Sequence, residues 1–436
     1  MLAHPTSYYG PVSLAVGDEV RLRIEKPAAG GWMIARERGQ VVMVSGAIPG
    51  ETVVARVERS GKGVAFACVV SVAEASGDRR DPFTDPLCGG CLYAHVAYPR
   101  QLEIKGQVIA DALARIGRVP LAAPVVVVAS PAEGYRMRAR LHVRGPNLGF
   151  FREATHDICD ARSTRQLLPA TCDVLDRAAA ALRSLGAAGV REVEVSETIT
   201  ADQRALHLEA AGPLDSGPIA ALADDAGITG LTLGSRLLGG DPHVVDTLTV
   251  DGRRLELRRH VQSFFQGNRF LLEGLVVRVL EHVPPRAEVV DFYAGVGLFS
   301  IAAAVAREAH VQAVEGDRSA ARDLVFNAGA HQGAVEAIAR PVESFVRGSR
   351  ERVDVLIVDP PRTGLSREAV DRALALEPQT IIYVSCDVAT LARDVRRLID
   401  AGYSLTVVDA FDLFPNTPHV EAVVKLERAK LAGVRS

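Results

Sequence analysis

Cys386 carries the side chain best suited to covalent chemistry in this chain, and its position favours such a role. It follows the apolar run 381–385, which indicates a buried strand of a parallel sheet. Ligands bind outside the carboxyl ends of such strands, so the thiol faces an expected crevice rather than the core. Carboxylates stand nearby in the sequence, at Asp359 and Glu421. An isolated intracellular cysteine is most often a small buried side chain, so the surrounding motifs must decide between these interpretations.

A glycine-rich turn and an acidic residue favour a nucleoside cofactor. Gly295 and Gly297 stand between an expected strand and an expected helix, where glycine lets the backbone approach a ligand closely. Glu315 ends the next expected strand, and a carboxylate there can accept both hydroxyls of a ribose. The turn lacks the third glycine of the dinucleotide fingerprint, which favours S-adenosylmethionine (SAM) over NAD.

The loop Asp359-Pro360-Pro361-Arg362 indicates a planar base as the substrate. Prolines stiffen the loop and hold the Asp359 carboxylate at the crevice. Methyltransferases that act on exocyclic amines often use a similar proline-rich motif, so the loop alone does not name the atom attacked. Amines are already nucleophilic, whereas C5 of a uracil becomes a carbon nucleophile only after a thiolate adds at C6. Cys386 therefore favours uracil C5 as the methyl acceptor.

Strands and helices alternate from about residue 286 onward, which predicts an open, mostly parallel α/β sheet. We expect strands at 288–292, 310–315, 335–339, 353–358, 380–385, 404–410 and 421–426. Only the segment 411–420 separates the last two, so we predict that they form an antiparallel pair. Five such strand–helix units closed by a hairpin resemble the Rossmann-like class I SAM methyltransferase fold.

The N-terminal part predicts a different architecture. Short alternating apolar runs with Gly and Pro turns between about residues 12 and 73 are typical of a small β-barrel. We divide the chain into a barrel domain at 1–75, a mixed α+β central domain at 76–255 and a catalytic domain at 256–436. A helix predicted over 99–116 belongs either to the central domain or to the surface of the catalytic one.

One predicted strand of the central domain carries basic residues on a single face. Period-two spacing puts Arg136, Arg138, Arg140, His142 and Arg144 on the same side. A merely solvated strand normally mixes charges of both signs. We therefore predict that this face contacts RNA or another phosphate-bearing ligand.

Bulk composition is that of a soluble globular protein, with 436 residues, 48% hydrophobic and 24% charged. The net charge of -3 gives no global positive field, so RNA would need a local basic surface. The longest apolar stretch, near 121–128, is too short to cross a bilayer, and the chain opens without a basic-then-apolar leader. We expect a cytoplasmic monomer that does not enter a membrane.

Several motifs in order resemble the RNA 5-methyluridine (uracil-C5) methyltransferases. They are Phe264-Phe265-Gln266-Gly267-Asn268, the loop 359–364, Tyr383-Val384-Ser385-Cys386 and the segment 412–421. The N-terminal barrel, with Gly46-Ala47-Ile48-Pro49-Gly50-Glu51, looks like that family's TRAM domain, an OB-type RNA-binding module. The resemblance covers nearly the whole chain.

The resemblance implies a role for each matching residue. Cys386 would attack C6, SAM would supply the methyl group to C5, and Glu421 would remove the C5 proton. Gln266, Tyr293, Glu315 and Asp359 match the positions that hold SAM and face the uracil. A free thiol has a pKa of about 8.5, so some local activation of Cys386 is required, and its source cannot be identified from the sequence.

The chain departs from the family at an iron–sulfur site that many members carry. Cys88-Gly89-Gly90-Cys91 is present, but Pro82 and Thr164 stand where the other two cysteines are expected. Cys159 and Cys172 lie nearby at different spacings. Two thiolates rarely hold such a cluster, so we expect Cys88 and Cys91 to form a bare or zinc-bound knuckle more readily than a cluster site.

Two smaller departures lie near the expected site. Asp387 and Val388 follow the cysteine where the family usually has Asn-Pro, and Pro341 stands near the place of an adenine-contacting polar residue. Neither removes a reacting group.

The sequence thus predicts a SAM-dependent RNA uracil-C5 methyltransferase, with rRNA favoured over tRNA as substrate. Two alternatives stay open at this point. The chain could be an RNA-binding protein with a degenerate methyltransferase domain, or an RNA methyltransferase that acts on an exocyclic amine.

Overall fold

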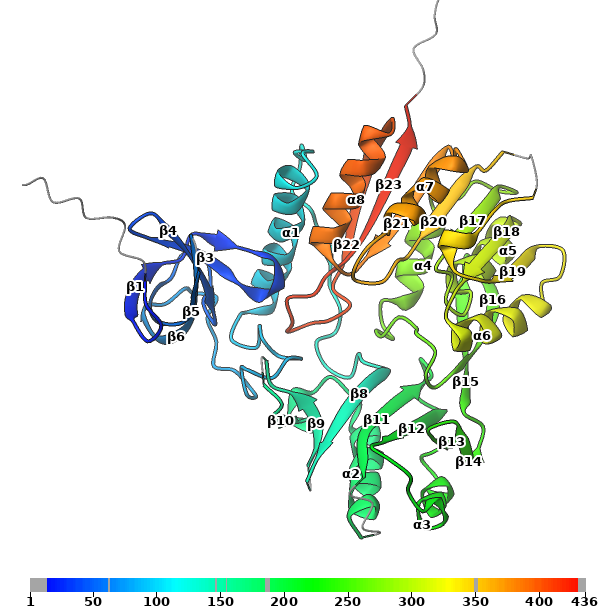
Figure 1. Cartoon of the computed structure of the whole chain (residues 1–436), viewed down its shortest axis with the longest axis horizontal. Helices are drawn as coiled ribbons and strands as arrows, with labels where there is room; N and C mark the ends of the chain where they lie inside the picture. The colour runs from blue at the N-terminus through cyan, green and yellow to red at the C-terminus, as the bar shows by residue number, and fades with distance from the viewer. Residues whose placement is uncertain are drawn as a thin grey trace, which may run out of the picture.

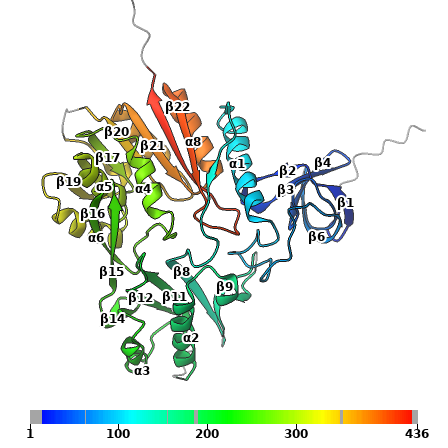
Figure 2. The same cartoon turned by 180° about the vertical axis from the view of Figure 1, so that it is seen from behind.

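The computed structural model describes residues 14–61, 63–145, 147–153, 155–184, 189–348 and 352–429. It contains a small barrel, a central α+β part and a large α/β part (Figures 1 and 2). Within the described residues no helix is both long and apolar enough to cross a membrane.

The N-terminal sheet has six strands in the order β1-β5-β6-β4-β3-β2. Their bounds are β1 Glu19–Arg23, β2 Lys26–Pro27, β3 Met33–Glu37, β4 Gln40–Ser45, β5 Thr52–Gly61 and β6 Val64–Glu74. Alternate residues such as Val42, Val44 and Val53 fill its core. Tyr93 and Ile104 also pack there, so segments beyond the barrel complete its core.

The first long helix, α1 (Tyr98–Arg115), lies between the barrel and the C-terminal strands of the catalytic sheet (Figure 1). Its residues Val108, Ile109 and Leu113 pack in the same cluster as Leu391 and Val395 of the last helix, α8 (Val388–Asp400). The predicted helix over 99–116 therefore exists, and its apolar face lies against the catalytic sheet. The short strand β7 (Val127–Val128) follows it and joins that sheet.

The central part contains a seven-stranded sheet in the order β10-β9-β8-β11-β12-β13-β14. Its elements are β8 Arg138–Arg144, β9 Asn147–Phe151, β10 Ile158–Asp160, α2 Pro169–Ser184, β11 Val190–Glu197, β12 Arg204–Ala210, α3 Ser216–Ala220, β13 Gly230–Leu233 and β14 Arg236–Gly240. Helix α2 packs on this sheet through Val174, Leu175 and Ala178.

A hairpin of β15 (His243–Val250) and β16 (Arg253–His260) leads into the catalytic part. Strand β16 crosses the position 255/256 at which the sequence analysis divided the central domain from the catalytic one. Leu248 and Leu257 of the hairpin pack in one cluster with Leu275 of α4 (Leu272–Leu280).

The catalytic sheet has eight strands in the order β19-β18-β17-β20-β21-β23-β22-β7. Its remaining elements are β17 Glu288–Phe292, α5 Leu298–Arg307, β18 His310–Glu315, α6 Arg318–Gly329, β19 Val335–Ala339, β20 Val355–Val358, α7 Arg367–Ala375, β21 Thr380–Ser385, β22 Tyr403–Phe411 and β23 Glu421–Arg428. Short 3-10 turns lie at Ala29–Gly31, Arg162–Thr164, Ala221–Asp224 and Val342–Ser344.

Helices cover both faces of this sheet, which explains why its inner strands carry apolar residues on both faces. In β21, Ile382 and Val384 face the cluster of α4, α5 and α6, whereas Ile381 and Tyr383 face that of α1, α7 and α8. Strands β17 to β21 are parallel, and β23 runs antiparallel between β21 and β22. The predicted fold class and the antiparallel last pair are both confirmed.

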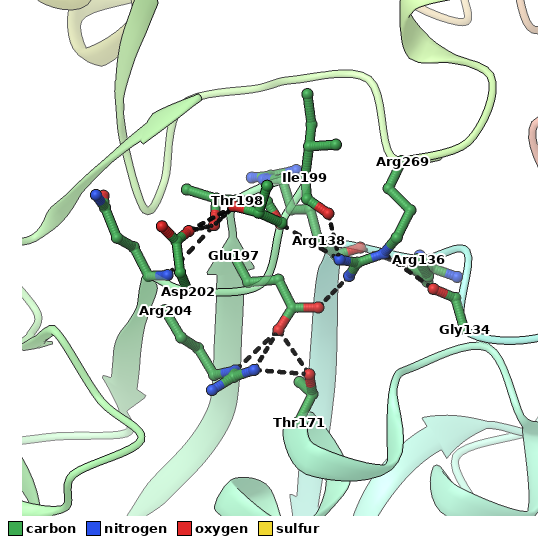
Figure 3. Close-up of polar contacts among 12 residues, drawn as sticks. Gly134, Arg136, Arg138, Thr171, Glu197, Thr198, Ile199, Asp202, Arg204 and Arg269 are labelled. Carbon is green, nitrogen blue, oxygen red and sulfur yellow. Dashed lines mark hydrogen bonds and ion pairs between the residues drawn. The ribbon is translucent and has the colours of Figure 1, made fainter. Parts of the chain in front are cut away.

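A buried ionic network joins the central sheet to the catalytic part (Figure 3). Glu197, at the end of β11, accepts hydrogen bonds from Arg204 of β12 at 2.6 Å and from Arg269, which precedes α4. Arg269 also donates to the carbonyl oxygens of Gly134 and Ile199, at 2.9 and 2.8 Å. The segment that carries Gln266 is thereby fixed against the central sheet.

Candidate active site

Four of the predicted site residues stand at strand ends on one edge of the catalytic sheet. Glu315 ends β18, Asp359 follows β20 and Cys386 follows β21, and the carboxyl ends of these parallel strands share an edge. Glu421 begins β23, which runs antiparallel to β21, so its first residue lies at that same edge. Strand order thus brings together residues that are up to 106 positions apart (421 minus 315).

The Cys386 thiol follows β21 opposite the start of β23, where the charges of Glu421 and Arg362 act on it. Burial and the Glu421 carboxylate raise the pKa of its thiol to about 11, while Arg362 opposes this through its charge and a hydrogen bond. Arg362 follows the two prolines of the loop 359–364 and is exposed. Its charge stabilises the thiolate. This role was not apparent from the sequence, which indicated only that the loop positions the Asp359 carboxylate.

The two carboxylates whose charge acts on the thiol are Glu421, which is buried, and Asp359, which is half-buried. Burial raises the pKa of Asp359 to about 7, Glu315 adds to this rise, and a 3.2 Å hydrogen bond from Gln266 opposes it. Burial and Asp359 raise the pKa of Glu421 well above its usual value, and Arg362 opposes that rise. The site therefore holds an excess of carboxylates, which suits a cationic ligand.

Gly295 and Glu315 meet across the turn after β17. The Gly295 amide donates to Glu315 Oε2 at 2.8 Å, and the Asp317 amide donates to Oε1 at 2.6 Å. Gly297 has a φ of 96° and a side chain there would meet Leu324 at 2.9 Å, so only glycine fits. Each Glu315 oxygen retains a lone pair that could accept from a ribose hydroxyl, and the predicted contact with the cofactor stays a prediction.

Two further residues of this turn have unusual surroundings. Tyr293 has a φ of 62°, and its half-buried hydroxyl lies near Glu343. Asp291 is fully buried, accepts a 2.5 Å hydrogen bond from Ser300 and leaves its Oδ1 without a partner. Burial raises the pKa of Asp291 to about 7. The sequence analysis missed Asp291, although an acidic residue inside an otherwise apolar strand was a usable signal.

The loop between β22 and β23, residues 412–420, carries Glu421 at its end and is held by the N-terminal half of the chain. Lys105 of α1 donates to Asp412 Oδ1 at 2.5 Å and to the Phe414 carbonyl at 3.1 Å, and both charged groups are buried. Gln101, one turn earlier, exchanges hydrogen bonds with Asn416.

The central domain reaches the same loop from another side. The Tyr135 hydroxyl donates to the carbonyl oxygen of Pro415 at 3.4 Å, and Asn268 donates to that of Leu413 at 3.0 Å. The sequence analysis placed Asn268 in a family motif but assigned it no contact. Its amide thus joins the Gln266 segment to the loop that carries Glu421.

The predicted basic face lies on β8 and on Arg136, two positions before it, but acidic residues of β11 neutralise much of it. Arg138 and Arg140 both pair with Glu194, at 3.2 and 2.7 Å. Arg136 is half-buried and donates to Gln166 at 2.7 Å. Contact of these arginines with RNA stays a prediction.

The cysteines of the predicted knuckle do not converge on a metal site. Cys88 forms a disulfide with Cys159, and the Cys91 thiol donates to the Thr164 carbonyl at 3.8 Å. Cys172 is a separate buried thiol. Among the described residues no group of three His, Cys, Asp or Glu side chains is arranged to hold a metal ion. These residues therefore do not fit an iron–sulfur cluster or a zinc ion.

Comparisons with known proteins agree with this geometry. Residues 344–429 match the family model described as tRNA (uracil-5-)-methyltransferase, and residues 14–70 match the TRAM domain. The chain is 33% identical to a 23S rRNA (uracil(1939)-C(5))-methyltransferase, RlmD, of Halomonas elongata, over 95% of this chain and 91% of that protein. The chain belongs to the RNA uracil-C5 methyltransferase family. An RlmD of Pseudomonas fluorescens is 32% identical over 95% of each chain.

A solved structure supports the same conclusion for this methyltransferase. The tRNA (uracil-54, C5)-methyltransferase of Pyrococcus abyssi, in complex with S-adenosyl-L-homocysteine, superimposes with a TM-score of 0.72 at 25% identity. The match covers 93% of this chain and 99% of that one. The predicted family, TRAM domain and dependence on SAM are confirmed.

Proposed function

We propose that this methyltransferase methylates C5 of a uridine in RNA through a covalent adduct between Cys386 and C6. The Cys386 thiolate adds to C6, which places a carbanion at C5. The carbanion would accept the methyl group from the sulfonium of bound SAM, whose sulfur keeps the electron pair of the broken bond and leaves as S-adenosylhomocysteine. Glu421 then removes the C5 proton, and breakage of the sulfur–C6 bond restores the ring double bond and frees the thiolate.

The observation that carries this proposal is that Cys386, directly after β21, and Glu421, the first residue of the paired strand β23, stand at the same sheet edge, with Arg362 hydrogen-bonded to the thiol. A guanidinium beside the thiol favours the thiolate needed for addition. A carboxylate whose pKa is raised is a stronger base toward the C5 proton than an ordinary surface carboxylate. Transfer to an exocyclic amine would use neither the thiol nor this base.

Residues on three strand ends are suited to hold SAM. Glu315 offers acceptors for the ribose hydroxyls, and Gly295 and Gly297 let the backbone come close. Asp359, held by Gln266, provides a negative charge near the thiol.

We further propose that the substrate is 23S rRNA. Two relatives that are more than 30% identical over most of both chains are named as 23S rRNA enzymes for uracil 1939. The solved tRNA enzyme is less similar, at 25% identity. Methyl transfer to a 23S rRNA fragment containing that uridine, compared with a tRNA transcript, tests this choice.

Trapping with 5-fluorouridine RNA tests the covalent mechanism. Fluorine cannot leave C5 as a proton does, so the wild-type protein should form a stable adduct that survives denaturing electrophoresis, with Cys386 as the modified residue in peptide mass spectra. Cys386→Ala should form no adduct and should lose methylation. If the protein only bound RNA, the Cys386→Ala substitution would change neither measurement.

Glu421→Gln supplies the second half of the test. It should still add to unmodified RNA, accumulate the methylated adduct, and turn over about 10²–10⁴-fold more slowly. Absence of any adduct with 5-fluorouridine RNA in a protein that still methylates normal RNA would overturn the mechanism.

A further inference from the structure

A stripe of exposed basic and aromatic side chains runs along α6, outside the predicted RNA face. Arg318, Arg322 and Phe326 follow each other at four-residue spacing, which puts them on one side of the helix. Arg258 of the neighbouring β16 stacks over the Phe326 ring at 3.5 Å. We call these four residues the α6 stripe; α6 and β16 lie side by side in both views (Figures 1 and 2).

The cations of the α6 stripe have little local neutralisation. Arg318 and Arg322 form no hydrogen bond or ion pair with any described residue. The nearby Asp323 is buried, accepts hydrogen bonds from the His260 amide and the Ser263 hydroxyl, and is 4.0 Å from Arg258. Arg138 and Arg140 of β8, in contrast, pair with Glu194.

The aromatic side chain of the α6 stripe is open to solvent. Phe326 is 55% exposed and its neighbour Val325 is 53% exposed. An exposed aromatic ring with a guanidinium on one face is a platform on which a nucleic-acid base can stack. Two like charges one turn apart destabilise a helix, and a bound phosphate chain relieves that repulsion.

The α6 stripe begins beside the candidate active site. Ser319, next to Arg318, contacts the Ser263 hydroxyl at 3.1 Å, and Phe264 follows with 60% exposure, two residues before Gln266. Arg318, Arg322 and Val325 also line a pocket of about 340 Å³ that reaches Glu315. From Arg318 to Phe326 the helix rises about 12 Å.

We propose that the α6 stripe binds single-stranded RNA next to the target uridine, with phosphates on Arg318, Arg322 and Arg258 and a base stacked at Phe326. This inference rests on the proposed function for the identity of the ligand. It places an RNA-binding surface on the catalytic domain, in addition to the TRAM barrel and the predicted face of β8 in the central domain.

Salt-dependent binding of a fluorescein-labelled oligouridylate, measured by anisotropy with the full-length protein, tests the charges. Single strands lose affinity with a log–log slope of about -0.7 for each phosphate neutralised. Arg318→Ala/Arg322→Ala should therefore reduce the slope by about 1.4 between about 50 and 200 mM NaCl. The matched control, Arg115→Ala/Arg396→Ala, removes the same charge from α1 and α8 and should leave the slope unchanged.

Two more variants separate stacking from charge. Phe326→Ala should weaken oligouridylate binding at least about fivefold, and Phe326→Tyr should restore it. Arg318→Lys/Arg322→Lys should retain the salt slope. Affinity for S-adenosylhomocysteine should stay within about twofold in every variant, because the α6 stripe is assigned to RNA.

Three outcomes would overturn the proposal. An unchanged slope in the Arg318→Ala/Arg322→Ala variant would show that these arginines do not contact RNA phosphates. Weaker S-adenosylhomocysteine binding with unchanged RNA binding would assign the α6 stripe to the cofactor pocket. A change of sedimentation coefficient in Phe326→Ala would assign it to contact between copies of the chain. Binding is read without methyl transfer, so failure to detect 5-methyluridine would count against the proposed function alone.

Discussion

At the scale of single residues, the main property of the site is its surplus of buried carboxylates. Asp359 has a pKa near 7 and Glu421 one well above its usual value, because each carboxyl group is shielded from water and lies near another carboxylate. A positive charge placed beside them would lower both pKa values and cause these carboxyl groups to release protons. The sulfonium of SAM is such a charge, and the neutral sulfur of S-adenosylhomocysteine is not.

This difference predicts a pH-dependent preference for SAM over its product. Asp359 gains its charge as pH rises through about 7, so SAM affinity should increase about tenfold from pH 6 to pH 8, while S-adenosylhomocysteine affinity changes much less. Isothermal titration in buffers of different ionisation enthalpy should also detect proton release with SAM only. In Asp359→Asn the pH dependence should disappear; equal pH profiles for the two ligands in the wild-type protein would contradict the expectation.

The sequence was informative about which residues stand at strand ends, and less so about what they contact. Cys386, Asp359, Glu315 and Glu421 were identified because each follows or begins an apolar run. The contact between Arg362 and Cys386 was not, since it depends on how the loop after β20 folds over the end of β21. A side chain in a loop has no periodicity from which its direction can be read.

At the scale of elements, the loop 412–420 leads into β23, whose first residue, Glu421, is paired with Phe411 of β22. The loop contains no regular structure, so its position depends on Lys105 and Gln101 of α1 and on Tyr135. A buried ion pair such as Lys105–Asp412 adds little net stability, but its geometry is specific. We expect this pair to act in positioning the loop.

Replacement of both partners by apolar residues should separate positioning from stability. Lys105→Met alone leaves a buried charge on Asp412 and should lower the free energy of unfolding by about 3–5 kcal/mol. Lys105→Met/Asp412→Leu should recover most of that loss, yet its kcat should remain about tenfold or more below wild type with little change in the KM for RNA. Denaturant melts and steady-state methylation measure the two effects.

The matched control for this prediction lies on the same helix. Lys26 pairs with Asp111 of α1 at the barrel, where both side chains are partly exposed. Lys26→Met should cost no more than about 1 kcal/mol and should not change kcat. A double variant with wild-type kcat would show that Lys105 and Asp412 have only a structural role.

Element types were more predictable than element partners. Period-two spacing placed the basic residues on one face of β8. The absence of acidic residues from that face was taken as evidence of an unpaired basic surface, without regard to the strand that pairs with it. The neutralising Glu192 and Glu194 come from β11, about fifty residues later, and only the strand register places Arg140 opposite Glu194. Long-range register of this kind is not encoded in a local window.

At the scale of the whole molecule, the central and catalytic parts are joined by charges buried out of water. Glu197 is fully buried and serves two arginines, Arg204 and Arg269, one from each part. Removal of the shared carboxylate leaves both guanidinium groups unpaired.

Glu197→Ala should therefore lower the free energy of unfolding by about 3–5 kcal/mol in urea melts, and Glu197→Gln, which keeps a hydrogen-bond acceptor, by less. Glu133→Ala removes the exposed partner of Arg165 and should change it by no more than about 1 kcal/mol. If Glu197→Ala unfolds like the Glu133 variant, the network does not contribute to the cohesion of the two parts.

The attachment of α1 and β7 to the C-terminal sheet has a consequence for biosynthesis. Strand β7 pairs with β22, and the apolar face of α1 packs against α8, so residues 98–128 need partners made almost 300 residues later. During vectorial synthesis the TRAM barrel can fold early, whereas α1 and β7 must wait until the ribosome has released the last strands. Until then their apolar surface is available to chaperones. The edge strand β7, although synthesised before all other strands of the catalytic sheet, can join that sheet only after β22 has been made.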